Sequence, residues 1–178
     1  MGLRPARTCR EVDKPAWTRY SHRKPRKSYV KARPHNTLIH MDMGVEKKDY
    51  DVEISLVAKV PIQLRDNSLE SARLAVHKHL QRVAAEDYSF KILPYPHIIV
   101  REHKMLTGAG ADRLSSGMKH AFGRPTDRAA RLKKGQKLFV VRTFSKHIDH
   151  VLEAYRRAKC KISGRYKVNI TRLTPSSG

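Results

Sequence analysis

The stretch YDVEISLVAKV (residues 50–60) carries the clearest strand pattern in the chain. Every second side chain from Tyr50 to Ala58 is apolar, and Asp51, Glu53 and Ser55 lie between them. This period of two is typical of a strand with one face in the core. Pro61 ends the strand or places it at a sheet edge, because proline cannot donate to a ladder. Just upstream, residues 37–43 alternate more weakly before Gly44 and predict a shorter strand.

A helix follows the central strand. Asn67 and Glu70 have the spacing of a capping box, so we expect the helix to begin at Asn67. Its apolar side chains recur every three or four residues, at Leu69, Ala72, Val76, Leu80 and Val83. The spacing predicts a helix of about five turns lying on a sheet.

The second half of the chain repeats this mixture of strands and helix. Residues 90–100 predict a strand bent by Pro94 and Pro96, and residues 129–132 and 137–144 predict a hairpin around Gly135. LFVVRTF (residues 138–144) is apolar on both faces, which favours a central strand. A second helix is expected after a Ser145 cap. Its apolar stripe is Ile148, Val151, Leu152 and Tyr155, and Glu153 and Arg157 form a stabilising pair at four-residue spacing. Its exposed face is basic and carries Lys146, Arg156, Arg157 and Lys159.

Gly164 is expected to stop that helix, and the alternation of Tyr166, Val168 and Ile170 predicts a last strand. The element order therefore predicts an α+β fold, with one mixed sheet carrying two helices on one face. A chain of 178 residues is expected to form a single domain. We place that domain at residues 36–178 and a basic arm at residues 1–35.

The charge balance predicts a polyanionic partner. The chain has 38 Lys and Arg against 16 Asp and Glu, a formal net charge of +22. Solubility needs a net charge of only about 2–8, whereas phosphate contacts reward each additional cation. Nucleic acid is therefore the expected partner. A membrane is not, because no apolar run approaches the roughly 18 residues of a spanning helix.

Metal, cofactor and disulfide chemistry are not expected. Cys9 and Cys160 lie far apart and predict reduced thiols in a cytoplasmic protein. His147 and His150 could share a helix face, but no third ligand lies near them in the sequence.

The first 35 residues predict an RNA-binding arm. They hold eleven Lys or Arg against Glu11 and Asp13, with four prolines and three aromatic rings. Such a segment cannot build its own core, but its cations can meet phosphates and its rings can stack on unpaired bases. A solvated tail without a specific partner is the alternative. From the arm, the segment at residues 128–134 and the second helix, the predicted RNA contacts are Arg4, Arg7, Arg10, Lys14, Trp17, Arg19, Arg23, Lys24, Arg26, Lys27, Arg128, Arg131, Lys133, Lys134, Arg156 and Arg157.

Residues 101–128, REHKMLTGAGADRLSSGMKHAFGRPTDR, have no sustained apolar period. A structureless stretch of this length inside a compact domain is usually functional or disordered. Four glycines permit close backbone approach, and six cations could meet phosphate. We therefore expect a functional loop, with a mobile surface loop as the alternative.

No catalytic constellation is expected. Gly108 and Gly110 suggest a nucleotide loop, but Arg113 stands where the third glycine belongs. Glu102, Asp112 and Asp127 could serve a metal-dependent nuclease, although each follows or precedes an arginine in the sequence. The expectation is a protein without enzymatic activity. A free-standing RNA chaperone and an RNA-processing enzyme are the alternatives.

The same residues resemble a ribosomal protein family. The chain resembles the archaeal and eukaryotic L-ten-e proteins, the counterparts of bacterial L-sixteen, over most of its length and in family order. The matching blocks are RPAR (4–7), MDMG (41–44), EISLVA (53–58), PYPH (94–97), Arg101, Glu102 and Lys104, MLTGAGADRL (105–114), Gly117 and Met118, AFGRP (121–125) and AARLKKGQK (129–137). Residues 21–35 depart from the family pattern.

The resemblance implies an α/β-hammerhead fold and a place in the large subunit of cytoplasmic ribosomes. It implies binding to large-subunit rRNA beside the elbow of A-site tRNA, with the long loop pointing toward the peptidyl-transferase centre, neighbouring ribosomal proteins as partners, and a role in tRNA placement and late assembly. An archaeal member is expected, because the chain ends without the extension of eukaryotic members. Carried over by matching position, the functional loop contains Arg101, Lys104, Thr107, Gly108, Gly110, Asp112, Arg113, Lys119, Phe122 and Arg124.

Overall fold

The computed structural model describes residues 33–47, 49–102, 108–109 and 124–173, together with residues 5, 10 and 12. Their elements, in chain order, are β1 (Asp42–Gly44), β2 (Val52–Ala58), β3 (Ile62–Arg65), α1 (Asp66–Val83), β4 (Tyr88–Ile92), β5 (Ile98–Glu102), β6 (Arg124–Leu132), β7 (Lys137–Thr143), the 3-10 helix η4 (Ser145–His147), α3 (Ile148–Lys159) and β8 (Tyr166–Arg172). The α+β class is confirmed.

The strands form two sheets, so the expectation of one mixed sheet is wrong. A five-stranded sheet has the order β1-β4-β7-β2-β8, and a three-stranded sheet has the order β3-β6-β5. Every pairing among the described residues is antiparallel. The predicted central position of LFVVRTF is confirmed, because β7 is the middle strand of the larger sheet.

One predicted strand and one predicted hairpin are each divided between the two sheets. The bent strand at residues 90–100 is two strands, with β4 in the larger sheet and β5 in the smaller one. Residues 129–132 and 137–144 are not a hairpin, because β6 pairs with β3 and β5 while β7 pairs with β2 and β4. The turn at Gly135 bonds to a third segment instead, since the Gly135 N–H donates to the Ala58 carbonyl at 2.9 Å.

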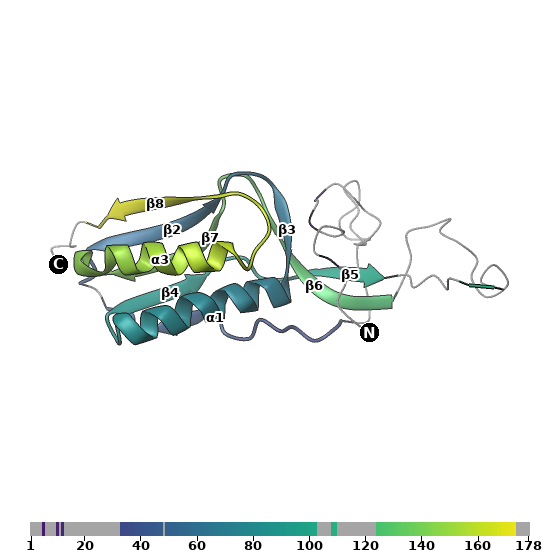
Figure 1. The fold of residues 1–178 in the computed structure, drawn as a ribbon, viewed down its shortest axis with the longest axis horizontal. Coiled ribbons are helices and arrows are strands. Elements are labelled where there is room, and N and C mark those ends of the chain that lie inside the picture. Colours follow the sequence, from purple (N-terminus) through teal and green to yellow (C-terminus); the bar gives the residue numbers. More distant parts are fainter. Residues whose placement is uncertain are drawn as a thin grey trace.

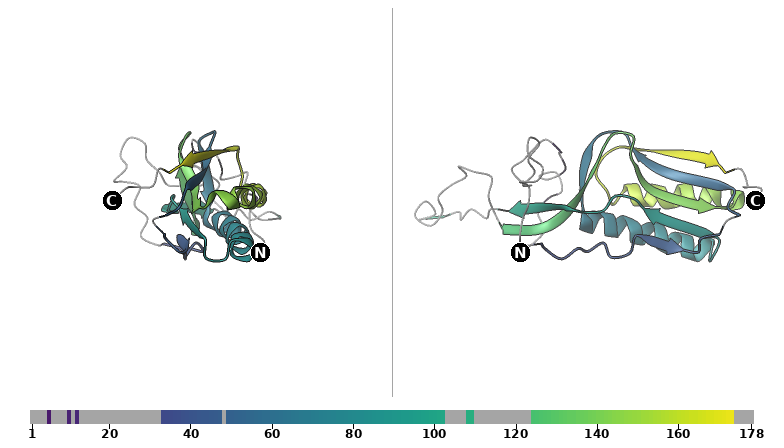
Figure 2. Two further views of the ribbon diagram at one scale, coloured as in Figure 1. Left: turned by 90° about the vertical axis from the view of Figure 1, so that its left-hand side faces the viewer. Right: turned by 180° about the vertical axis from the view of Figure 1, so that it is seen from behind.

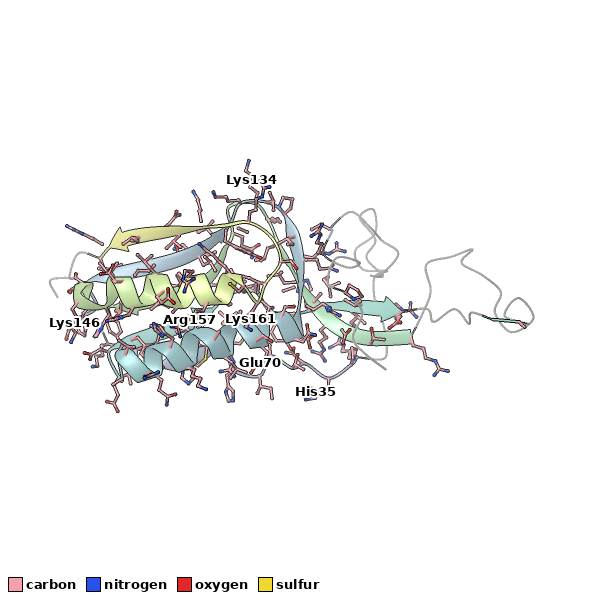
Figure 3. All side chains as sticks on the ribbon, in the orientation of Figure 1. His35, Glu70, Lys134, Lys146, Arg157 and Lys161 are labelled. Carbon is pink, nitrogen blue, oxygen red and sulfur yellow. The ribbon has the colours of Figure 1, made fainter. Side chains whose placement is uncertain are left out.

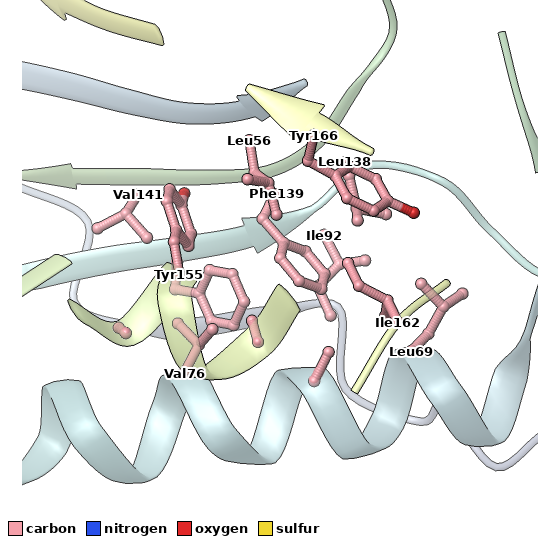
Figure 4. Packing of buried hydrophobic residues seen from close by; sticks show 14 of the residues in the cluster. Leu56, Leu69, Val76, Ile92, Leu138, Phe139, Val141, Tyr155, Ile162 and Tyr166 are labelled. Carbon is pink, nitrogen blue, oxygen red and sulfur yellow. The ribbon is translucent and has the colours of Figure 1, made fainter. Parts of the chain in front are cut away.

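Both α-helices of the described part lie against one face of the larger sheet (Figures 1 and 2). Leu69 and Val76 of α1 meet Phe139 of β7 and Tyr155 of α3 in a continuous apolar core (Figure 4). Burying each such side chain contributes about 1.5–3 kcal/mol. The Tyr155 hydroxyl donates to the Ile54 carbonyl at 2.8 Å, which ties α3 to β2.

The helix starts differ from the predictions. α1 begins at Asp66, its N-cap Arg65 makes no side-chain capping bond, and Asn67 lies inside the helix, so the predicted capping box is wrong. Glu70 pairs with Arg73 instead of returning to the helix start. Ser145 does not cap the second helix either, because η4 comes first and α3 then begins after His147. The Asp66 carboxylate accepts a hydrogen bond from the backbone N–H of Asn67 at 2.9 Å. The sequence pattern did not predict this bond at the helix start.

The smaller sheet carries a long projection. β5 and β6 reach beyond the helices (Figure 1), and Glu102 pairs with Arg124 where β5 ends and β6 begins. The predicted structureless stretch at 101–128 therefore has strand at both of its ends. The start of β6 was not predicted, because Pro125 and the charged residues around it give no apolar period. The strand predicted at residues 37–43 is also shorter than expected, since β1 covers only Asp42–Gly44.

Candidate nucleic-acid interface

The two ends of the larger sheet differ in the charge of their connecting segments. One end of the sheet is marked by Val52, which pairs with Thr143 and Arg172, and by Tyr88, which also pairs with Thr143. The segments that connect the elements at this end carry Glu46, Asp49, Asp51, Glu86 and Asp87, and Asp149 lies in the first turn of α3 at the same end. The turns at the opposite end, at residues 59–61, 133–136 and 160–165, contain no Asp or Glu.

Backbone hydrogen bonds hold these acid-free turns together. The Lys59 N–H donates to the Arg165 carbonyl at 2.9 Å, and the Ala58 N–H donates to the Gln136 carbonyl at 3.0 Å. The exposed cations Lys59, Lys133, Lys134 and Arg165 therefore lie on adjoining turns, and we call these four residues the basic turn cluster. Lys161, which is also exposed, lies at the start of the 160–165 turn beside the end of α3 and is not counted in the cluster. None of the four is within ion-pair distance of an Asp or Glu in the described part of the chain.

Several cations of the acidic end are already neutralised. Lys47 and Lys146 lie 2.8 and 2.9 Å from the Asp87 carboxylate, and their hydrogen bonds lower the pKa of Asp87 to about 2. Figure 3 shows Lys146 at this end and Lys134 at the acid-free turns. An exposed pair is weak as a source of stability, but each paired lysine has less charge to offer a phosphate.

The exposed face of α3 is partly neutralised. Arg156 and Arg157 share the Glu153 carboxylate at 2.7 and 3.0 Å, which confirms the predicted four-residue pair. Their hydrogen bonds, that of Arg156 first, lower the pKa of Glu153 to about 2. Because two guanidinium groups share one carboxylate, a net positive charge stays on this face. Figure 3 labels Arg157 on α3.

The open face of the larger sheet has a shallow hollow of about 170 Å³. Among the residues that line it, Lys137 and Arg142 bond the Glu53 carboxylate at 2.7 and 3.1 Å. This arrangement uses the cations internally, so the hollow is a weak candidate for phosphate.

The smaller sheet joins the arm to the projecting strands. The Gln63 N–H of β3 donates to the Arg10 carbonyl at 2.8 Å, and the Arg131 side chain of β6 donates to the Gln63 side chain at 3.0 Å. Farther along β6, Arg128 donates through Nε to the Pro34 carbonyl at 2.7 Å. The arm is therefore attached at two points to the sheet that carries the predicted loop.

Comparison with known proteins identifies the chain's relatives. The sequence model for "Ribosomal protein L16p/L10e" matches residues 17–169. The chain belongs to this family. It is 42% identical to the large ribosomal subunit protein uL16 of Methanococcus aeolicus over 171 residues, which is 96% of this chain and 95% of the relative. The proteins of the same name from Thermoplasma acidophilum and Haloarcula marismortui are 40% and 38% identical, over 97% of this chain and 94% and 96% of their own lengths. The resemblance read from the sequence is confirmed.

Ten of the predicted site residues of this L16p/L10e member fall within the described residues. Lys133 and Lys134 lie in the basic turn cluster, Arg156 and Arg157 on α3, and Arg10, Arg128 and Arg131 at the smaller sheet. Arg101 lies on β5, Arg124 begins β6 and is exposed, and Gly108 is exposed with φ +138°.

The other predicted residues lie outside the described part of the chain. They are Arg4, Arg7, Lys14, Trp17, Arg19, Arg23, Lys24, Arg26 and Lys27 of the arm, and Lys104, Thr107, Gly110, Asp112, Arg113, Lys119 and Phe122 of the loop. Lys59 and Arg165 were missed, although Pro61, two residues after Lys59, and Gly164, next to Arg165, were available signals for turns.

Of the acidic residues considered for catalysis, Glu102 and Asp127 belong to no group that could hold a metal among the described residues, and Asp112 lies outside them. Asp127 faces Arg65 at 4.0 Å, and burial raises the pKa of its carboxyl. No group of three or more His, Cys, Asp or Glu that could hold a metal occurs among the residues the structure describes. No described helix is long and apolar enough to cross a membrane.

Proposed function

We propose that this protein binds large-subunit rRNA beside the elbow of A-site tRNA, with its long loop directed toward the peptidyl-transferase centre. There it supports tRNA placement and late assembly of the subunit. As a member of the L16p/L10e family, the chain is a structural, non-enzymatic component of the large subunit of cytoplasmic ribosomes. rRNA and neighbouring ribosomal proteins are its partners, and A-site tRNA is the further partner in this proposal.

The observation that carries the proposal is the distribution of unpaired cations. The basic turn cluster lies at the end of the larger sheet away from the acidic segments, and the same half of the molecule carries the arm attachment and the projecting strands (Figures 1 and 3). Phosphate contacts supply most of the affinity for a folded RNA, since the narrow groove of paired RNA hides its bases. We therefore propose that rRNA contacts this half.

The proposal assigns separate tasks to the two parts of the chain. Residues 1–35 act as an extended arm and residues 36–178 as a single domain of α/β-hammerhead type. The arm and the basic turn cluster anchor the protein on rRNA. The loop between β5 and β6 acts on tRNA and on the maturing peptidyl-transferase region.

Deleting residues 104–119 tests this division. Because Glu102 and Arg124 are partners in neighbouring antiparallel strands, the five residues left between them can close as a short hairpin. Large-subunit particles lacking this protein are supplied with either wild-type or deleted chain. The deleted chain should bind with wild-type affinity, but the particles should translate poorly.

A cation variant gives the matched control. With Lys134 and Arg165 changed to Gln, binding should weaken, and translation should recover once the protein is supplied at saturating concentration. Normal translation by particles filled with the loop-deleted chain would contradict the role of the loop. Failure of wild-type protein to join the particles would contradict the proposed function as a whole.

A further inference from the structure

The connection between β4 and β5 presents three side chains to solvent. Along residues 92–98 exposure alternates, so Leu93, Tyr95 and His97 are exposed while Pro94 and Pro96 between them are buried. Proline has no N–H for a ladder and holds the preceding residue in an extended conformation. The segment therefore displays its odd-numbered side chains on a stiff, extended backbone outside both sheets.

The Tyr95 ring is held in place without being covered. Half of the residue (51%) is exposed, and no aromatic ring among the described residues contacts it. Its hydroxyl accepts a hydrogen bond from Arg128 Nη1 at 3.3 Å, and Arg128 is itself fixed by the Pro34 carbonyl at 2.7 Å. The His97 ring lies 3.1 Å from the Tyr95 carbonyl, which adds a second local restraint.

The position of Tyr95 is as informative as its exposure. Arg128 brings three segments together at this point: the end of the arm at Pro34, the β4–β5 connection and the strand that leads to the loop. An RNA that contacts both the arm and the loop strands passes close to this junction. Unpaired bases in such RNA stack on exposed aromatic rings, which need no base-specific hydrogen bonds.

We propose that Tyr95 is a stacking platform for one unpaired base of large-subunit rRNA, held in orientation by Arg128. This inference rests on the proposed function. It adds a contact between a protein ring and an RNA base to the contacts between protein cations and RNA phosphates. The occupant is a nucleobase and not an aliphatic protein surface, because the ring stands among the cations that attract RNA. An aliphatic contact with a neighbouring protein would tolerate Tyr95→Leu, whereas a stacked base would not.

Substitution at Tyr95 distinguishes a stacked base from other contacts. Binding of full-length protein to large-subunit particles lacking it is measured for wild type and for Tyr95→Phe, Tyr95→Leu and Tyr95→Ala. Stacking predicts that Tyr95→Phe binds within about twofold of wild type, because it keeps the ring, and that Tyr95→Leu and Tyr95→Ala weaken binding by about 5- to 150-fold. The log–log salt slope should be the same for all four proteins, because no phosphate contact is removed.

A control at a distant site guards against a general effect of surface change. Leu74 on α1 is 50% exposed, and Leu74→Ala should bind as wild type does. Thermal unfolding of each Tyr95 variant should match wild type, since the ring is half exposed and outside the core.

Three results would overturn the inference while leaving the proposed function standing. Equal binding by all Tyr95 variants would show that the ring is unused. Wild-type binding by Tyr95→Leu with weak binding by Tyr95→Ala would show an aliphatic protein contact. A reduced salt slope would show loss of phosphate contacts. If wild-type protein itself fails to bind the particles, the proposed function fails first.

Discussion

Removing two cations from the basic turn cluster should flatten the salt dependence of ribosomal binding by a defined amount. In the variant Lys134→Gln with Arg165→Gln, both changes are at exposed side chains without a described ion pair, so the fold is expected to be unaffected. Each phosphate contact contributes about 0.7–0.9 to the log–log slope, so loss of both contacts should reduce the slope by about 1.4–1.8. The affinity difference should therefore be largest at low salt.

The assay measures binding to large-subunit particles lacking the protein at several potassium chloride concentrations. The matched control is Lys78→Gln with Arg82→Gln, which removes the same charge from exposed positions toward the C-terminal end of α1. Its slope should stay close to that of wild type, because only net charge has changed. Equal slopes for wild type and the cluster variant, or an equal reduction by the control pair, would refute the assignment of this surface to phosphate.

Three further predictions concern the fold that presents this surface. Tyr155→Phe should destabilise the protein by about 1–3 kcal/mol in urea unfolding with an unchanged m value, because it leaves a buried carbonyl without its 2.8 Å donor; no loss would contradict the bond. Gly44 and Gly135 both have φ +83°, so Gly135→Ala, in open space, should cost about 1–2 kcal/mol. Gly44→Ala should cost about 1–3 kcal/mol more than Gly135→Ala, since its Cβ would meet the Tyr88 carbonyl. Equal losses of stability in thermal unfolding would show that this contact has no cost. Asp87→Asn should lower the urea midpoint at pH 7, and its difference from wild type should shrink between about pH 4 and pH 2, because a carboxyl lowered from 3.8 to about 2 gives up its stabilisation over that interval; a constant difference would show that the lysine pairs are not its source.

Local patterns in the sequence were sufficient for individual elements. The period of two around Ile54 and the apolar spacing of Leu69 and Val76 predicted β2 and α1, because burial of one face leaves a period in the residues themselves. The two-sided apolar character around Phe139 likewise predicted a central strand. The short strand β3 was not expected, since four residues after Pro61 are too few to show a period.

The pairing of strands could not be predicted from local patterns in this way. Nothing in the residues around Gly135 shows that β6 and β7 belong to different sheets, because that choice depends on β3 and β5, which lie far away in the chain. The predicted capping box failed for a related reason. Asp66 accepts the N–H of Thr37 at 3.0 Å, so this helix start is organised by a contact between residues distant in sequence.

The candidate interface could be predicted from the sequence only in part. The run containing Lys133 and Lys134 stands out in the sequence, whereas Lys59 and Arg165 join it only through backbone bonds between separate turns. Tyr95 lies within a block that also marked the family, but its exposure became informative only once Arg128 and the end of the arm were found beside it.

Lysine reactivity in the isolated protein and in intact large subunits tests the central claim most directly. Acetylation followed by peptide mass spectrometry reports each side chain separately, and Lys78 serves as an exposed reference away from the basic turn cluster. The account predicts that Lys59, Lys133 and Lys134 react readily in the isolated protein and become protected in the subunit, while Lys78 stays reactive. Protection of Lys78 with continued reactivity of the three cluster lysines would contradict it, because rRNA would then lie against α1 and not against the basic turn cluster.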